Sequence, residues 1–185
     1  MTSIAVFSGS PSLTSKTAIL GDFVVSSLRQ RGLSANHVKV RELPGEALLA
    51  GNADHPAIAR EVGRIADADG AVFVTPIYKA SFSGLTKLFI DLLPQFALRG
   101  KVVMPLATGG SLAHVLALDY GLRPVLQSLG ARHIVQSYFV LQSEIESEVS
   151  KAISTAPLFR QTIDEFCESV TFDRSYTAQS RVAAC

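Results

Sequence analysis

The stretch Ile4-Ala-Val-Phe-Ser-Gly-Ser-Pro-Ser-Leu-Thr-Ser-Lys-Thr17 begins as an apolar run and passes through hydroxyl-rich residues into an amphipathic segment. This order predicts a buried strand, a loop and the start of a helix. Such a turn directs backbone N–H groups and the positive end of the helix dipole toward one point. The hydroxyls of Ser10, Ser15 and Thr17 can converge there with the Lys16 ammonium. We therefore expect a phosphate site in this loop.

The loop does not have the spacing of two common phosphate motifs. A Walker loop needs Gly-x4-Gly-Lys-Ser/Thr and a dinucleotide fingerprint needs Gly-x-Gly-x-x-Gly, whereas Gly9 is followed by Ser10 and Pro11. Hydroxyl side chains in place of glycines favour a terminal phosphate monoester, because a pyrophosphate usually needs bare backbone to pass closely. The phosphate of flavin mononucleotide (FMN) is the leading candidate. The alternative is an ordinary surface turn built from Ser, Gly and Pro.

Composition narrows the class of protein. The 185 residues fit a single domain, and 48% hydrophobic against 18% charged residues indicates a globular protein rather than a disordered one. The net charge of +1 and the scattered basic residues argue against nucleic acid as a partner. The longest apolar runs are strand-sized and no signal peptide is visible, so we expect no membrane span and a cytoplasmic location. Cys167 and Cys185 match no metal or redox spacing, and we expect two free thiols.

Strand-like and helix-like segments alternate along the chain, which predicts a parallel sheet with helices on both faces. The expected strands are Ile4–Phe7, His37–Val40, Ala71–Thr75, Lys101–Ala107 and His133–Val140. The economical topology is a flavodoxin-like, doubly wound, five-stranded parallel sheet of order 2-1-3-4-5. We expect one domain over residues 1–170, an irregular segment from Arg41 to Asn52, and a disordered or partner-facing tail over residues 171–185.

In this topology a ligand crevice lies beyond the carboxyl ends of strands 1, 3 and 4. The third strand ends in Thr75-Pro-Ile-Tyr-Lys-Ala-Ser-Phe-Ser-Gly84 and the fourth in Ala107-Thr-Gly-Gly-Ser111. We expect the first of these to form a loop whose backbone meets the polar rim of a planar ring, and the glycines of the second to permit positive φ and close approach. The candidate ring-binding residues are Pro76, Ile77, Tyr78 and Lys79, with Thr108, Gly109 and Gly110. Tyr78 as a half-buried loop aromatic, Lys79 as a solvated side chain and the glycines as a simple turn remain alternatives.

The segment from Ser111 to Gly130 is predicted to be a helix with apolar residues on two faces. Leu112, Val115, Leu116, Leu122, Leu126 and Leu129 follow one stripe, while Leu118, Tyr120 and Val125 lie off it. One face would pack on the sheet and the other on another subunit or a thicker core. His114 is a weak candidate for cofactor contact, with no proton-transfer role, and no cluster of metal ligands is visible.

Four motifs in this order resemble those of the NAD(P)H-dependent FMN reductases, in the branch that supplies reduced flavin to alkanesulfonate monooxygenases. They are Ser8-Gly-Ser-Pro11 with Ser15-Lys-Thr17, Thr75–Gly84, Ala107-Thr-Gly-Gly110 with His114, and Asp119-Tyr-Gly-Leu-Arg-Pro124. The likeness extends from about Ser3 to Phe139.

The resemblance implies reduction of FMN by NADPH or NADH, with FMN as a substrate or loosely bound cofactor. Ser10, Ser15, Lys16 and Thr17 would hold its phosphate, and the seven ring-binding candidates would border its isoalloxazine. A tyrosine matching Tyr120 would lie at a π-type bulge in a tetramer interface, linked to flavin release. The implied partner is a flavin-dependent sulfonate monooxygenase. Two other readings stay open: a quinone or azo reductase with tightly bound FMN, and a flavodoxin-type electron carrier, which the near-neutral charge disfavours.

Overall fold

The structure is a computed structural model that describes residues 1–145 and 156–183, with side chains described through Phe172. In chain order its strands and helices are β1 (Ser3–Ser8), α1 (Lys16–Gln30), β2 (Ser34–Lys39), a 3-10 helix (Val40–Glu42), α2 (Gly45–Leu49), α3 (Pro56–Asp67), β3 (Gly70–Tyr78), β4 (Ser81–Phe82), α4 (Gly84–Ile90), β5 (Val102–Gly109), a 3-10 helix (Leu112–His114), a π-helix (Leu118–Leu122), α5 (Arg123–Ser128), β6 (His133–Ile134), β7 (Tyr138–Leu141), a 3-10 helix (Gln142–Ile145) and α7 (Pro157–Ala183).

The main sheet is parallel and has the order β2-β1-β3-β5-β6, with β7 also pairing with β5. Because β4 is a short antiparallel addition to β3, this order is the predicted flavodoxin-like 2-1-3-4-5 in different numbering. One expectation was wrong in detail: the fifth strand is not continuous from His133 to Val140. It consists of two short strands, β6 and β7, which pair with the beginning and the end of β5 respectively.

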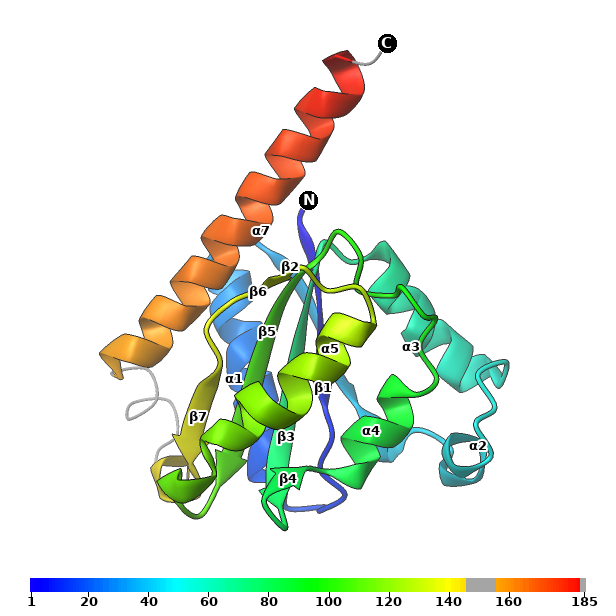
Figure 1. Cartoon of the computed structure of the whole chain (residues 1–185), viewed down its shortest axis with the longest axis vertical. Helices are drawn as coiled ribbons and strands as arrows, with labels where there is room; N and C mark the ends of the chain where they lie inside the picture. Colours follow the sequence, from blue (N-terminus) through cyan, green and yellow to red (C-terminus); the bar gives the residue numbers. More distant parts are fainter. Residues whose placement is uncertain (146–155, 184–185) are drawn as a thin grey trace.

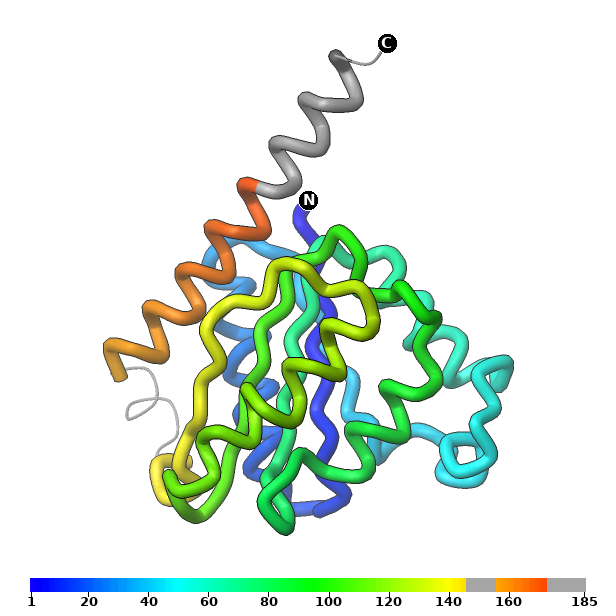
Figure 2. Tube along the Cα trace, in the orientation of Figure 1, coloured from blue at the N-terminus to red at the C-terminus, as the bar shows by residue number. Residues whose placement is uncertain are grey.

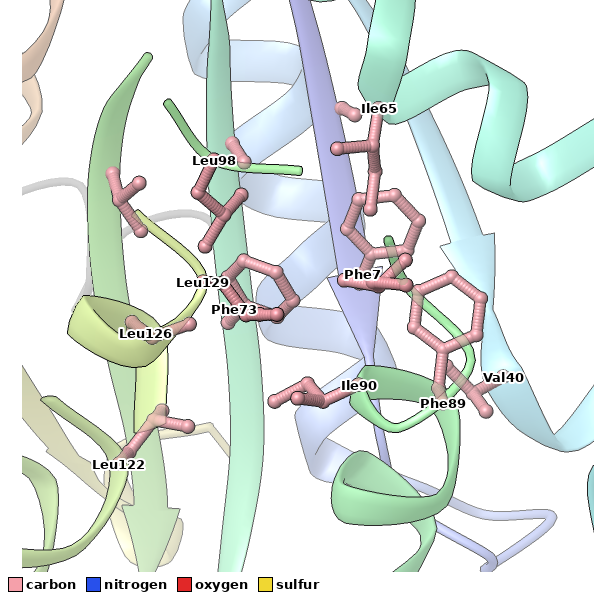
Figure 3. Packing of buried hydrophobic residues seen from close by; sticks show 14 of the residues in the cluster. Phe7, Val40, Ile65, Phe73, Phe89, Ile90, Leu98, Leu122, Leu126 and Leu129 are labelled. Carbon is pink, nitrogen blue, oxygen red and sulfur yellow. The ribbon is translucent and has the colours of Figure 1, made fainter. Parts of the chain in front are cut away.

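Helices cover both faces of the sheet (Figure 1), so β3 and β5 are buried almost throughout and have apolar residues on both faces. On one face, residues of α3, α4, the π-helix and α5 pack against Phe7 of β1 and Phe73 of β3. The Phe7 ring stacks on Phe73 and Phe89 with centroid distances of 5.6 and 4.9 Å, at the centre of this packing in Figure 3. These aromatic contacts fix α4 over the end of β1.

The other face is covered by α1 and α7. Phe159 and Phe166 of α7 are fully buried against it, and the Phe159 ring lies 4.9 Å from that of Tyr138 in β7. Figure 2 traces α7 alongside α1 as far as Phe172. Cys167, on this helix, is a free thiol, and burial raises its pKa to about 11. Cys185 lies outside the described residues.

One expectation about an irregular segment was wrong, because the stretch from Arg41 to Asn52 contains a 3-10 turn and α2. The backbone from Thr171 continues α7 to Ala183, and no Gly or Pro interrupts the sequence after Pro157. The expectation of a disordered or partner-facing tail over residues 171–185 stays a prediction. Within the described residues, no helix has both the length and the apolarity needed to cross a membrane.

Candidate functional site

The carboxyl ends of β1, β3 and β5 are neighbours in the sheet, and the segments that follow them meet at one edge, the lower one in Figure 1. Gly9 N–H donates to the carbonyl of Val74 at 3.0 Å, which joins the first segment to β3. Pro76 of β3 lies opposite Thr108 of β5 in the parallel register. The structure therefore brings together the three stretches that the sequence predicted to form one crevice.

The loop after β1 forms around the start of α1. Ser15 is the N-cap residue, and its Oγ accepts a hydrogen bond from the Ala18 N–H at 3.0 Å. Ser10 Oγ accepts from the Ser12 N–H at 3.3 Å. Both hydroxyls and that of Thr17 are buried, while Lys16 is half-buried. An accepting hydroxyl keeps its own hydrogen for donation, so Ser10 and Ser15 can shape the loop and still bind an anion.

A buried network of hydroxyls connects this loop to the segment after β3. The Ser83 hydroxyl donates to the Gly9 carbonyl and caps α4 by accepting from the Thr86 N–H at 3.1 Å. Thr86 Oγ1 in turn donates to Thr75 Oγ1 at 3.1 Å. None of these three hydroxyls was among the predicted site residues, although a serine such as Ser83 immediately before an apolar helical stripe is a typical N-cap signal.

Gly9 is required by this network. A Cβ at Gly9 would lie 1.9 Å from Thr86 Oγ1, which no side-chain adjustment of that short residue relieves. The glycine therefore serves the close packing of two loops.

The segment after β3 differs from the expected loop. Pro76, Ile77 and Tyr78 are the last residues of β3, and the chain then folds back as β4 with Tyr78 opposite Ser81. Lys79 and Ala80 form the two-residue turn of this hairpin, with φ values of 50° and 62°. Two positive φ angles are what a type I′ hairpin requires, and at non-glycine residues they carry strain. Tyr78 is half exposed and Lys79 exposed at the hairpin tip.

The end of β5 supplies an orphaned polar atom. Thr108 is fully buried, and its Oγ1 has no hydrogen-bond partner within the described part of the chain. Such a group costs free energy unless a ligand or water satisfies it.

The two glycines that follow have different surroundings. A Cβ at Gly109 would lie 2.9 Å from Cζ of Phe139, whereas one at Gly110 would meet nothing within 4 Å. The two glycines permit positive φ but do not use it, because neither is among the positive-φ residues. Gly109 makes room for Phe139, and Gly110 is exposed at the end of β5.

The predicted helix from Ser111 to Gly130 contains the π-helix, with Tyr120 at its centre, as the resemblance implied. The predicted stripe does not continue through this segment. Its later members Leu122, Leu126 and Leu129 are buried, together with Leu118, which was placed off the stripe. Its earlier members are exposed. The π-turn shifts the angular phase of the residues around it, which leaves the preceding apolar side chains on the outside. This exposed apolar face consists of Leu112, Val115, Leu116 and Tyr120, the last with 80% of its surface accessible.

The π-helix also contacts the hairpin. A Cβ at Gly121 would lie 3.5 Å from the Phe82 ring of β4, so little space separates the two elements. Arg123 fixes the other side of the π-helix: it donates to Asp119 at 3.1 Å and to the carbonyls of Ile134 and Val135 at 3.1 and 3.0 Å. The exposed apolar face is thus part of a supported element beside the hairpin tip. His114 lies half-buried at the start of the same segment.

A buried histidine lies directly behind the first loop. His37 Nε2 is 2.8 Å from the hydroxyl of Ser8, the last residue of β1, and its Nδ1 is 2.7 Å from Asp22 Oδ1. Burial lowers the pKa of the His37 imidazole, and the hydrogen bond to Asp22 offsets this only in part. Burial raises the pKa of Asp22, but the hydrogen bonds from His37 and Lys39 outweigh it and bring that pKa below its usual value. A neutral His37 beside an ionised Asp22 therefore supports Ser8 at neutral pH.

These features fit a flat, singly phosphorylated ligand. The buried hydroxyls and helix start suit a phosphate, and the unpartnered Thr108 Oγ1 with the open space at Gly110 suits a polar-edged ring. The described residues contain no group of three or more His, Cys, Asp or Glu side chains that could hold a metal. The arrangement offers binding and orientation.

Comparison with known proteins identifies the family. The family model for NADPH-dependent FMN reductase matches residues 2–146. The chain is 44% identical to FMN reductase (NADPH) of Pseudomonas putida over 74% of its own length and 70% of that protein. It is 39% identical to FMN reductase (NADPH) of Escherichia coli over 77% of its length and 74% of that protein.

A solved structure agrees with these sequence matches. The apo form of the NADH:FMN oxidoreductase EMOB superposes with a TM-score of 0.85 at 46% identity, covering 91% of this chain and 90% of that one. The model match, the two relatives and the shared fold agree, and the chain belongs to the NADPH-dependent FMN reductase family.

Proposed function

We propose that this FMN reductase binds FMN across the carboxyl edge of the sheet as a dissociable substrate and reduces it with NADPH or NADH. Ser10, Ser15, Lys16 and Thr17 would hold the phosphate. Pro76 to Lys79 and Thr108 to Gly110 would border the isoalloxazine. The observation that carries this proposal is the orphaned Thr108 Oγ1 at the carboxyl end of β5, at the edge of a doubly wound sheet where the segments after β1, β3 and β5 follow neighbouring strands.

The phosphate end combines three kinds of donor. The start of α1 supplies backbone N–H groups and a positive dipole end, the buried hydroxyls supply short directional donors, and Lys16 supplies a full positive charge. Charge-assisted hydrogen bonds of this kind are the stronger ones. We expect this end to contribute most of the FMN affinity.

The ring end requires no protein acid or base. FMN, when bound, supplies the redox chemistry by accepting a hydride from the nicotinamide. The protein has to hold the two flat rings in contact and in register. Tyr78 beside the hairpin tip is half exposed, and a Cβ at Gly110 would meet nothing within 4 Å, so neither position is already filled by another part of the chain. His114 takes no proton-transfer role in this proposal.

The reduced flavin would leave for a second protein, a flavin-dependent sulfonate monooxygenase. The support is the resemblance of the Asp119-Tyr-Gly-Leu-Arg-Pro124 motif to the reductases of such systems, together with the exposed Tyr120 in the π-helix. A cytoplasmic location, with access to the nicotinamide nucleotides of that compartment, belongs to the same proposal.

We propose that the exposed apolar face of Leu112, Val115, Leu116 and Tyr120 joins copies of the chain in a homotetramer. The four large apolar side chains lie within nine consecutive residues and are exposed, and an exposed apolar cluster is typical of an interface between proteins. Light scattering of the wild type and of Tyr120→Ala tests this directly. A monomeric wild type contradicts the proposal, and a variant with fewer subunits supports it.

The experiment that tests the activity is the steady-state rate of NADPH oxidation with and without added FMN. Strict dependence on added FMN supports a reductase that uses flavin as a substrate. Turnover of a quinone or azo dye by the purified protein without added FMN would instead indicate a quinone or azo reductase with tightly bound FMN. Absence of nicotinamide oxidation in both conditions would select an electron carrier.

Lys16→Ala tests the phosphate end. We expect the Kd for FMN to rise about tenfold or more, because one charge-assisted contact is lost. Lys87→Ala is the matched control, since Lys87 lies on α4 and pairs with Asp91 at 2.6 Å on the surface. Equal FMN affinity in the two variants would remove Lys16 from the site. Riboflavin, which lacks the phosphate, should bind both variants alike.

A further inference from the structure

The loop after β1 carries more hydroxyls than one phosphate needs, and they lie in two layers. Ser10, Ser15 and Thr17 form the buried layer. Ser12 and Thr14 form an exposed layer, with their side-chain oxygens 3.5 Å apart. The buried layer is already assigned to FMN, so the exposed layer is available to a different ligand.

An arginine lies against this exposed layer. Arg41 follows β2 in the 3-10 turn Val40–Glu42, and its NH1 donates to the Ser12 carbonyl at 2.7 Å. Its side chain is only 17% exposed, so the guanidinium is held in place rather than free in solvent. Glu42 Oε1 is 3.9 Å from NH2, beyond hydrogen-bond distance. Within the described part of the chain, NH1 thus has one carbonyl partner and NH2 a long ion pair with Glu42, and the other guanidinium N–H groups make no hydrogen bond.

We propose that Arg41, with Ser12 and Thr14, forms a subsite that binds the 2′-phosphate of NADPH. The inference rests on the proposed function, in which a nicotinamide nucleotide must approach the same crevice. A phosphate monoester dianion suits a guanidinium fork flanked by hydroxyls. The 2′-phosphate is the one such group on the second substrate, and NADH has a hydroxyl in its place. The subsite thus gives the enzyme a preference for NADPH.

The phosphate of FMN is also a phosphate monoester, but the position of Arg41 argues against FMN as the ligand of this subsite. Arg41 reaches Ser12, whose side chain belongs to the exposed layer, and it contacts the loop through a backbone carbonyl rather than through the buried hydroxyls. Measuring FMN affinity and nucleotide preference in the same Arg41 variant distinguishes binding of the FMN phosphate from binding of the 2′-phosphate of NADPH.

The binding experiment uses adenosine 2′,5′-bisphosphate and adenosine 5′-monophosphate as probes in calorimetric titrations of the full-length protein. We expect the wild type to bind the bisphosphate about 10- to 100-fold more tightly, the range of a bidentate charge-assisted contact. Arg41→Ala should reduce this ratio to near one, and Arg41→Lys should retain part of it. In kinetics the ratio of kcat/KM for NADPH to that for NADH should fall by the same factor.

Arg132→Ala is the matched control, because Arg132 is an exposed arginine before β6, at the opposite edge of the sheet. Three results would overturn the inference: no preference of the wild type for the bisphosphate, an equal loss for both nucleotides in Arg41→Ala, or a loss of FMN affinity without a change in nucleotide ratio. The proposed function fails separately, if the wild type shows no FMN-dependent oxidation of either nucleotide. Even if the proposed function fails in this way, the calorimetric titrations with the two adenosine phosphates still test the subsite.

Discussion

The hydroxyl of Ser83 donates a buried hydrogen bond to the backbone carbonyl of Gly9, across 74 positions of sequence. The same oxygen accepts from the Thr86 N–H at 3.1 Å and caps α4. One side chain thus fixes both the start of α4 and the loop proposed to bind phosphate. A disturbance at Ser83 is therefore expected to reach both.

Ser83→Ala should lower the free energy of unfolding by about 2 kcal/mol, since it removes a cap and leaves the Gly9 carbonyl unpaired in a buried position. It should also weaken FMN binding, because the loop after β1 loses its support. Urea denaturation and an FMN titration measure the two effects. Ser81→Ala, an exposed residue of β4, is the control and should change stability by less than about 0.5 kcal/mol. If Ser83→Ala proves as stable as that control, Ser83 does not hold the two loops together.

The adjacent glycines at the end of β5 give a second prediction. Gly109→Ala should destabilise the fold by about 1 to 3 kcal/mol, because its Cβ would lie 2.9 Å from the buried Phe139 ring. Gly110→Ala should leave stability within about 0.5 kcal/mol, because its Cβ would meet nothing within 4 Å. In Gly110→Ala the Kd for FMN should nevertheless rise, if the flavin ring lies against that position. An unchanged Kd there would show that the ring is bound elsewhere.

The hairpin tip gives a third prediction, on stability alone. Ala80 has a φ of 62°, a conformation that costs a residue with a Cβ about 1 to 2 kcal/mol. Ala80→Gly removes this conformational cost, but glycine also gives the unfolded chain more backbone entropy, which offsets part of the gain. The net effect should be an increase of about 0.5 to 1 kcal/mol in the free energy of unfolding. Ala59→Gly, at an exposed position within α3, should instead lower the free energy of unfolding by about 1 kcal/mol. Thermal unfolding of the two variants compares them, and a destabilised Ala80→Gly would contradict the argument.

The parallel sheet and the convergence of its three loops could be predicted, because both depend on patterns that are local in the sequence. Apolar runs such as Ile4–Phe7 mark strands, and the doubly wound order places their carboxyl ends together. The break between β6 and β7 was missed, although the polar pair Gln136-Ser137 lies between the two apolar parts of the run from His133 to Val140. Its cause is tertiary: Arg123 occupies the carbonyls of Ile134 and Val135 at that point.

The parts of the site that escaped prediction depend on contacts between distant residues. Nothing near Gly9 in the sequence indicates that Thr86 Oγ1 lies where its Cβ would be. The hairpin at Lys79 and Ala80 carries no glycine or asparagine, the usual signal of a type I′ turn. The exposed residues Leu112, Val115 and Leu116 were placed on the same stripe as buried residues for a different reason, because a regular helical period fails on passing through a π-turn.

The pH dependence of stability provides the last prediction, through His37. Burial lowers the pKa of His37 in the folded protein below its ordinary value of 6.5. As pH falls below about 6.5, the unfolded chain takes up a proton that the folded protein does not, so the unfolded state binds more protons and stability decreases. The decrease ends once pH passes below the folded pKa. The charged groups that act on His37 are Asp22, Lys39 and Glu42.

His37→Gln should remove this part of the pH dependence while retaining a polar side chain near Ser8. The measurement is the free energy of unfolding of the wild type and the variant from pH 8 to pH 5. Their difference should change across this range, with the wild type losing more stability toward pH 5 than the variant. Parallel stability curves for the two proteins would contradict this prediction, because they would show that the pKa of His37 is the same in the folded and the unfolded protein.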